Sequence, residues 1–366
     1  MLYQSFLSAC FRNVQNSYKF YWFLAILEEL EVKKGNILPM HDLVVRMVAQ
    51  VWYPLDYYKL SFGPWDRFKE ISRFLSLGMK IDHTSHALSL FDQISKQLTQ
   101  KKQEILYKKI HDLIRYVPYR FIRPFFEQEL RGKADHVINK EIIRLANQEF
   151  LERKVMYRFS STLSDIEIHP EWRTYLLANS DLIRKAIYWE LLNFLQKNNP
   201  NVIGLPEKLF KPVCRDLQKA RKFWNTYREI VGCVDCIYSG ERLTGTISLD
   251  HFVPWSYIVH DQIWNIVPTS RSVNSTKGDQ LAAVDVYLPR LIHLHYNAFR
   301  TIFHSNLATK EILLEDYCSL FKKELKEIDA LPEDVFGKVY SNTLVPMLQF
   351  AANMGFGSGW RYKGKD

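Results

Sequence analysis

Apolar residues recur at helical spacing along most of the 366-residue chain. One such run begins after Ser17 and ends before Gly35, so its ends carry a capping residue and a helix stop. The same pattern predicts further helices over residues 40–52, 86–116, 140–157, 180–198, 209–231 and 308–328. The chain is therefore predicted to be mainly α-helical.

The pattern changes between residues 232 and 268, where Gly, Ser and Thr alternate with short runs of strand-forming residues. Helical spacing resumes after Gly278, and the stretch "NNPNVIGLP" at 198–206 is the best linker. We therefore predict a mainly α fold with a small α+β insert. Residues 1–200 would form a helical domain for recognition, regulation or assembly, 207–290 a basic helix with the insert, and 291–366 a C-terminal helical region.

Composition supports a globular protein, because 47% of the residues are hydrophobic. The apolar run at residues 20–27 follows Lys19 and precedes Glu28 and Glu29, and no cleavage-site pattern accompanies it. No membrane span is therefore expected. Five cysteines, an odd number with one close pair, favour a reducing compartment over a disulfide framework, so a cytoplasmic location is predicted.

Charge is divided unevenly along the chain, whose net charge is +9. Residues 101–158 hold fourteen basic and eight acidic side chains, residues 208–228 hold seven and one, and residues 231–280 hold three and five. This pattern would result if the two basic segments bound a polyanion and the carboxylates of the acidic segment held a metal. Long helices with solvated basic faces are the alternative. Lys219, Arg221 and Lys222 are the candidate nucleic-acid contacts.

The acidic stretch contains "LDHFVPWSYIVHDQIWNIVPTSRSVNSTKGD" at 249–279. Asp250 and His251 end an apolar strand, so their side chains point to opposite sides and one can bind a metal while the other faces a reactant. If 270–277 is a short helix, Asn274 and Lys277 share one face and can be aimed at one point, such as a phosphate with its metal. Asn265 can fix a loop by bonding backbone groups.

These residues resemble the core of HNH endonucleases, the ββα-metal fold, and most closely the HNH domain of RNA-guided CRISPR effector nucleases. Asp250 and His251 match the family's Asp-His pair. Asn265 and Asn274 follow His251 by fourteen and twenty-three residues, as the family's asparagines do, and Lys277 follows three residues later. Upstream, "CIYSGERL" at 236–243 resembles the C-x-Y-x-G turn that opens such domains. The resemblance covers about 230–285, and the flanking helical regions match no family we know.

The resemblance implies a role for each matched residue. His251 would be the general base, Asp250 and Asn274 would hold one divalent cation, Asn265 would order the loop carrying His251, and Lys277 would face the phosphate oxygens. A histidine with a pKa near the working pH and two oxygen ligands suit this chemistry with Mg²⁺ or Mn²⁺. The implied activity is metal-dependent endonucleolytic cleavage of DNA.

Many HNH proteins also bind a structural zinc through two C-x-x-C pairs. Here only Cys233 and Cys236 form such a pair, and the spacing of Cys214, His293 or His295 fits no zinc pattern we know. Structural zinc is therefore not expected, and the small domain would depend on neighbouring helices for its stability.

The stretch "RYVPYRFIRPFF" at 115–126 has two interpretations. Arg115, Arg120 and Arg123 could contact phosphates, with Tyr116 or Tyr119 stacking on bases. Alternatively the aromatic residues form a core with the arginines at its rim, which we prefer. In the insert, the two tryptophans Trp255 and Trp264 are expected to be core residues rather than stacking platforms.

The chain shows neither a RuvC-like acidic motif nor an arginine-rich guide-binding helix. A bacterial restriction or antiphage-defence nuclease is therefore the preferred function, with DNA as partner and a protein partner or a second copy of the chain also considered. A catalytically inactive HNH fold that binds nucleic acid or a partner, and a mobile-element nuclease, remain alternatives.

Overall fold

The computed structural model describes residues 2–12, 14–64, 66–78, 87–97, 115–210 and 215–364. Three features noted in the sequence lie wholly or partly outside these residues: most of the helix predicted at 86–116, the first part of the basic stretch 101–158, and Cys214. Helices dominate what is described, with short strands in two places, so the predicted fold class is confirmed. None of the described helices combines the length and apolarity needed to cross a membrane.

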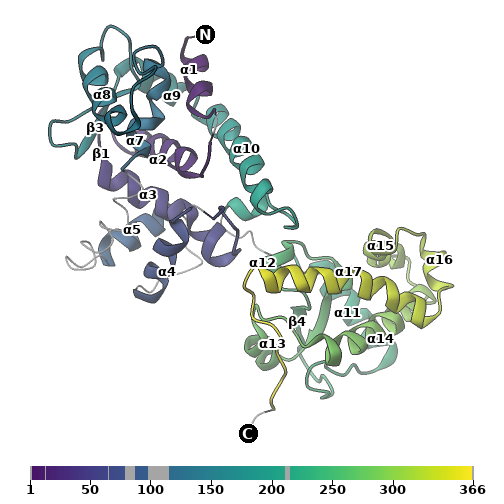
Figure 1. The fold of residues 1–366 in the computed structure, drawn as a ribbon. Coiled ribbons are helices and arrows are strands. Elements are labelled where there is room, and N and C mark those ends of the chain that lie inside the picture. The colour runs from purple at the N-terminus through teal and green to yellow at the C-terminus, as the bar shows by residue number, and fades with distance from the viewer. Residues whose placement is uncertain are drawn as a thin grey trace. The chain divides into compact units, whose positions relative to one another are not determined.

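The chain divides into two compact units (Figure 1). The first contains Met1–Pro200 and Leu205–Pro212, and the second contains Asn201–Gly204 and Val213–Asp366. The chain passes between the units at 200/201, 204/205 and 212/213, and only the first two of these points lie within the stretch 198–206. The C-terminal helices belong to the same unit as the α+β insert.

The first unit is built around one buried helix, α2 (Tyr18–Val32), which contains the apolar run noted in the sequence. Its other elements are α1 (Leu2–Cys10), β1 (Ile37–Pro39), α3 (Met40–Trp52), η1 (Tyr53–Tyr57), α4 (Phe68–Gly78), α5 (Ala87–Gln97), α7 (Val117–Phe121), η2 (Arg123–Phe126), α8 (Asp135–Gln148), β2 (Tyr157–Phe159), β3 (Asp165–Ile168), α9 (Pro170–Ala178), α10 (Ser180–Asn198) and η3 (Glu207–Leu209). Helices α3, α7, α9 and α10 pack against α2, which explains why a helix that is apolar on nearly every side is stable in water.

A small antiparallel sheet in the order β1-β3-β2 completes the first unit. This sheet corrects the sequence-based helix over 140–157, because α8 ends at Gln148 and Tyr157 begins β2. Strand β3 lies between the other two, with Ile166 opposite both Leu38 and Phe159. The apolar side chains of β2 and β3 are buried, and this tertiary burial outweighs the helical spacing of the segment.

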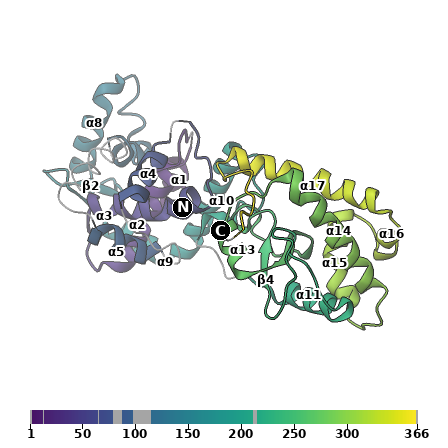
Figure 2. The same ribbon diagram turned by 90° about the horizontal axis from the view of Figure 1, so that it is seen from below.

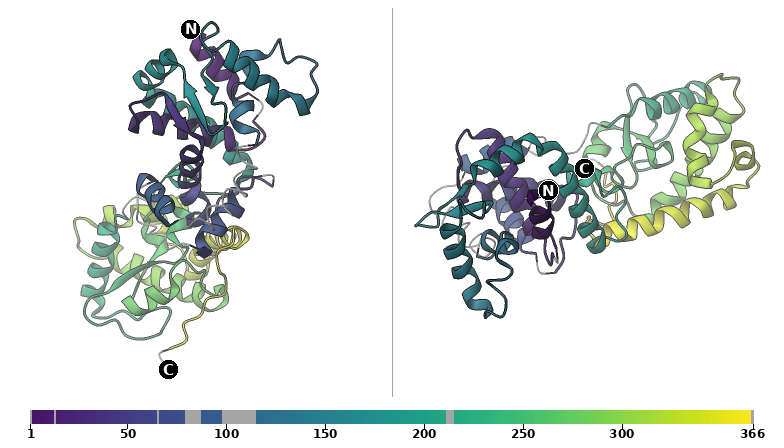
Figure 3. Two further views of the ribbon diagram at one scale, coloured as in Figure 1. Left: turned by 90° about the vertical axis from the view of Figure 1, so that its left-hand side faces the viewer. Right: turned by 90° about the horizontal axis from the view of Figure 1, so that it is seen from above.

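The second unit contains the insert and the helices that enclose it (Figures 1 and 2). Its elements are α11 (Gln218–Val231), β4 (Ser248–His251), α12 (Trp255–Ile258), η4 (Ile263–Asn265), β5 (Ile266–Thr269), α13 (Arg271–Lys277), α14 (Val284–Phe303), α15 (Lys310–Phe321), α16 (Leu325–Asp329) and α17 (Glu333–Asn353). After α17 the chain continues as an extended tail (Figure 3). The tail returns to the insert, where Trp360 pairs with Ala282 in a parallel bridge.

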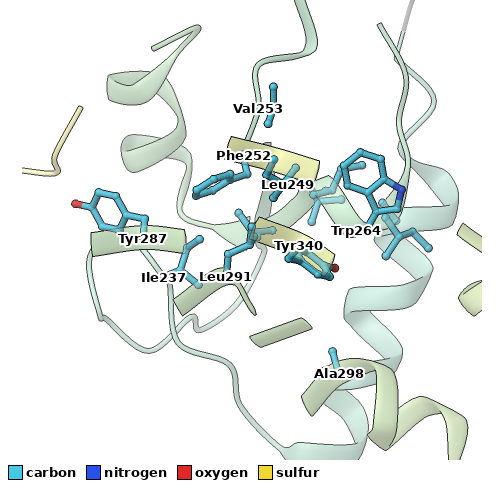
Figure 4. Close-up of a cluster of buried hydrophobic side chains, with 14 of the residues drawn as sticks. Ile237, Leu249, Phe252, Val253, Trp264, Tyr287, Leu291, Ala298 and Tyr340 are labelled. Carbon is cyan, nitrogen blue, oxygen red and sulfur yellow. The ribbon is translucent and has the colours of Figure 1, made fainter. Parts of the chain in front are cut away.

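One hydrophobic core joins the insert to these helices. Leu249 and Phe252 of the insert lie close to Leu291 of α14 and Tyr340 of α17 (Figure 4). Trp255 and Trp264 are buried, as predicted. The insert therefore gains its apolar burial from helices on both sides of it in the sequence.

Candidate functional site

A strand pair followed by a short helix forms the framework of the candidate site. Strands β4 and β5 are antiparallel, with Asp250 opposite Val267 and His251 opposite Ile266. Helix α13 follows directly, and Ser270 caps it by accepting a hydrogen bond from the amide of Val273. This is the β-β-α order that the sequence predicted for the insert.

Asp250 is buried, with 5% of its surface exposed, and its carboxylate has two neighbours. The hydroxyl of Tyr238 donates to Oδ2 over 2.7 Å, and the Lys277 ammonium lies 3.0 Å from the same oxygen. Tyr238 comes from the C-x-Y-x-G turn, in which the amide of Gly240 bonds the carbonyl of Cys236. Gly240 has φ +75°, a conformation that favours glycine, so this turn brings Tyr238 to the carboxylate.

Lys277 was expected to face the phosphate oxygens, and that role stays a prediction. Its side chain is fully buried. The ammonium donates to the His251 carbonyl over 2.8 Å and pairs with the Asp250 carboxylate. An ammonium without water needs such partners, and β4 supplies them.

Asn274 lies one helical turn before Lys277 and faces the same strand, as the spacing predicted. Its side-chain nitrogen donates to the hydroxyl of Ser248 over 2.9 Å and to the carbonyl of Leu249 over 3.0 Å. The carbonyl fixes which end of the amide is nitrogen, because only the amide NH₂ can donate to it. The described residues provide no hydrogen bond to the side-chain oxygen of Asn274, which leaves this oxygen able to bind a cation.

Asn265 fixes the chain just after His251. Its side-chain oxygen accepts from the Val253 amide and its nitrogen donates to the Val253 carbonyl, both over 2.9 Å. The Asn265 backbone carbonyl also accepts from the amide of Phe252 over 2.8 Å. A fully buried asparagine that binds both backbone groups of one residue holds this loop in a single conformation.

His251 points away from Asp250 and forms a pair with Asp261. The distance from His251 Nε2 to Asp261 Oδ1 is 2.8 Å, and 3% of His251 is exposed. A carboxylate can only accept, so Nε2 carries the proton in this bond and Nδ1 holds the lone pair of the neutral ring. The pair therefore sets both the orientation and the tautomer of His251.

Asp261 is itself held by the segment that leads into α11. The backbone amide of Asp216 donates to Asp261 Oδ2 over 2.8 Å. Burial raises the pKa of Asp261, but the hydrogen bond and charge of His251, the Asp216 amide and the charge of Arg215 outweigh burial and lower it overall. Asp261 therefore remains a carboxylate at neutral pH. Arg215 is an exposed cation beside this pair.

The oxygen atoms of Asp250 and Asn274 fit a hard divalent cation, because a carboxylate and an amide oxygen are ligands that Mg²⁺ and Mn²⁺ accept. Both residues lie on adjoining elements, β4 and α13. Among the described residues no group of three or more His, Cys, Asp or Glu could hold a metal. A cation here would take few protein ligands and complete its shell with water.

Three of the cysteine and histidine candidates for zinc, Cys236, His293 and His295, have other partners. Cys236 Sγ lies 3.1 Å from Thr269 Oγ1, and no bond is recorded for Cys233 in the described part of the chain. His293 pairs with Glu333 over 2.8 Å, and His295 is buried beside Tyr317.

The three predicted nucleic-acid contacts on α11 differ in their surroundings. Lys219 pairs with Glu315 over 2.6 Å and with Asp316 over 2.7 Å, so its charge is already balanced. Arg221 and Lys222 are exposed, and the described residues offer them no ion pair. The structure thus separates Lys219 from the two residues that remain able to contact a phosphate.

Sequence reasoning missed Tyr238, Asp261 and Arg215 as parts of the site. Tyr238 belongs to a turn that the sequence identified, but its bond to Asp250 depends on the tertiary fold. Asp261 lies in the polar loop "HDQ" at 260–262, and an acidic residue ten positions after the histidine was the available signal. Arg215 adjoins residues outside the described part of the chain, and no motif marks it.

Comparison with known proteins agrees with this geometry. Residues 236–283 match the family model for HNH endonucleases. No curated protein and no solved structure matches the chain significantly. The matching model describes HNH endonucleases in general, so the closer resemblance to CRISPR effectors stays a prediction. The matched residues include Tyr238, strands β4 and β5, and all of α13. They identify this part of the chain as an HNH endonuclease domain.

Proposed function

We propose that this protein is a metal-dependent endonuclease that hydrolyses phosphodiester bonds in DNA. The observation that carries the proposal is the arrangement of Asp250, His251, Asn265 and Asn274 on a β-β-α framework within the matched HNH residues. Each of these side chains has hydrogen bonds or surroundings that suit the role proposed for it.

His251 acts as the general base. Its Nδ1 accepts a proton from water, the water oxygen forms a bond to phosphorus, and the bond from phosphorus to the leaving oxygen breaks. The resulting imidazolium is stabilised by Asp261, whose carboxylate already accepts the Nε2 proton. Asp261 is therefore a positioning residue for His251, and Asn265 holds the backbone that follows it.

Asp250 and Asn274 would hold the cation, which would supply Lewis-acid stabilisation of charge on the scissile phosphate and the leaving oxygen. Lys277 balances the Asp250 carboxylate from the buried side. Contact with the substrate phosphates falls to exposed cations, Arg215 beside His251 and Asp261, and Arg221 and Lys222 on α11.

One observation favours a second candidate, an HNH fold that binds nucleic acid without cutting it. Lys277 and Tyr238 already occupy the Asp250 carboxylate, and His251 is almost fully covered. Catalysis requires a cation to bind beside this ion pair. A role in restriction or antiphage defence is part of our proposal and rests on the sequence-based preference alone.

The test is cleavage of supercoiled plasmid, single-stranded DNA and RNA by purified protein that is first treated with EDTA and then given Mg²⁺ or Mn²⁺. We expect metal-dependent DNA cleavage, a loss of about 10²- to 10⁴-fold in His251→Ala, and loss of metal-dependent activity in Asp250→Ala. His293→Ala removes an exposed histidine from the same unit and should retain full activity. Equal rates for His251→Ala and the wild type would disprove the role of His251, whereas binding without cleavage under all conditions would favour the second candidate.

A further inference from the structure

The first unit contains a cavity of about 850 Å³ with a strongly basic lining. It lies between the end of α1, α2, α7 and the segment after η2. Among the described residues its lining includes one carboxylate, Glu127, and six cations: Arg12, Lys19, Arg120, Arg123, Arg131 and Lys133. A second cavity of about 360 Å³ shares Lys19, Arg120 and Arg123 with it, so the two form one continuous basic surface.

Two of the six cations are already neutralised. Arg120 binds both oxygens of Asp135, over 2.8 and 3.0 Å, and Lys133 pairs with Glu141 over 2.6 Å. These ion pairs leave Arg120 and Lys133 with little charge for a ligand.

The other four cations have no carboxylate partner within the described residues. Arg12, Arg123 and Arg131 are exposed and form no ion pair there. Lys19 is half-buried and donates to the carbonyl of Cys10 over 2.9 Å. Burial lowers the pKa of Lys19, and the nearby charge of Arg123 lowers it further. Like charges held together around one cavity repel each other, and an anion bound between them would relieve that repulsion.

The lining also indicates which part of an anion is recognised. No aromatic side chain among the described residues lines the larger cavity, so it offers no platform on which a base could stack. Tyr116 lines the smaller cavity and is already flanked by Arg115 and Arg120. The guanidinium carbons (Cζ) of these two arginines lie 5.3 and 5.4 Å from the centre of its ring. Phosphate groups are therefore the recognised chemistry, and they carry no sequence information.

We infer that this basic surface binds the phosphate backbone of a nucleic-acid strand and forms a second contact region, separate from the HNH domain. The inference rests on the proposed nuclease function for the choice of a nucleic acid over other polyanions. It assigns a ligand to Arg123 of the stretch 115–126, whose phenylalanines Phe121, Phe125 and Phe126 are buried as the core interpretation expected.

The experiment measures DNA binding by the full chain carrying His251→Ala, in EDTA, so that cleavage does not interfere. Fluorescence anisotropy with a short duplex and with one of its strands gives the affinity at several salt concentrations. In this background the triple variant Arg12→Ala, Arg123→Ala, Arg131→Ala should bind on the order of tenfold more weakly at physiological salt, and its salt slope should fall by up to about one per arginine removed.

Two matched variants make the result specific. The triple change Lys140→Ala, Lys185→Ala, Lys197→Ala removes three exposed cations from the same unit but outside both cavities, and it should leave affinity and slope nearly unchanged. Replacing the three arginines by lysine keeps the charges and should retain most of the salt slope. The inference would be overturned if the variant with three arginines replaced by alanine and the control variant with three lysines replaced by alanine had equal affinities and salt slopes. Tighter binding of a mononucleotide than of either DNA would also overturn it.

The two proposals can fail separately. A protein that binds DNA through this surface but never cleaves it would refute the nuclease proposal and leave this site intact. A protein that cleaves DNA with unchanged affinity after loss of the three arginines would refute this site alone.

Discussion

Replacing Asp261 by asparagine tests the proposed mechanism with a minimal change in shape. In the wild type the carboxylate accepts the Nε2 proton of His251 over 2.8 Å, which leaves Nδ1 as the base. An asparagine amide can donate to Nε2 instead, and the ring proton then moves to Nδ1. The histidine would remain in place with its lone pair on the wrong nitrogen.

The expected loss follows from this tautomer change and from the lost charge. A general base contributes about 10²- to 10⁴-fold, and an aspartate-to-asparagine change beside a catalytic histidine can remove about 10⁴-fold. We therefore expect Asp261→Asn to slow cleavage by about 10²- to 10⁴-fold, equivalent to about 2.7–5.5 kcal/mol in the activation free energy.

The assay is single-turnover cleavage at saturating DNA and Mg²⁺, which reports the chemical step rather than binding. Asp279→Asn removes an exposed carboxylate just after α13 and serves as the control with unchanged rate. Affinity for DNA in EDTA and the thermal unfolding midpoint of Asp261→Asn should stay close to the wild type. A wild-type rate in Asp261→Asn would show that the pair with His251 does not control the base.

Two further predictions concern stability. Lys277→Met leaves the Asp250 carboxylate buried without its cation and should lower the unfolding free energy, measured in urea, by about 3–5 kcal/mol. The double variant that also carries Asp250→Asn should recover part of that loss. A loss below about 1 kcal/mol in Lys277→Met would mean that water reaches the ion pair. His295 is fully buried beside Tyr317, and burial lowers its pKa to about 3, so it stays neutral in the fold while the unfolded chain gains a proton below about pH 6.5. The stability contributed by neutral His295 is complete above about pH 6.5 and is lost as the pH falls toward 3. At pH 5 the unfolding free energy of the wild type should be about 2 kcal/mol lower on this account, a loss that His295→Gln should not show. An identical pH dependence of the unfolding free energy in both proteins would contradict this.

The framework of the site was predicted from the resemblance to HNH cores, whose asparagine offsets after the histidine match Asn265 and Asn274. The short helix considered at 270–277 agrees with α13. Helices at 40–52 and 180–198 were also predicted with their observed bounds, because each has a long apolar periodicity between clear stops. Local spacing and chain stops are properties that a sequence states directly.

Other features depend on contacts that no local pattern contains. The strands β2 and β3 have three and four residues, too few for a period of two to stand out against the helical spacing of the preceding segment. Helical spacing placed Lys277 on the same face as Asn274, but spacing does not show that the Lys277 side chain is buried. Asp261 reaches His251 only because Asn265 and the Asp216 amide fix the loop between them.

The extended tail limits how the HNH domain can be transferred to another protein as a module. Trp360 packs against Tyr238 with ring centres 5.3 Å apart, and Tyr238 holds the carboxylate of Asp250. A gene fragment that encodes only the matched residues 236–283 would lose this support, together with the apolar surfaces of α11, α14 and α17. Recombination that moves a stable HNH domain to another protein must therefore carry the chain through to the tail, and the unit of exchange is the whole second unit rather than the matched residues alone.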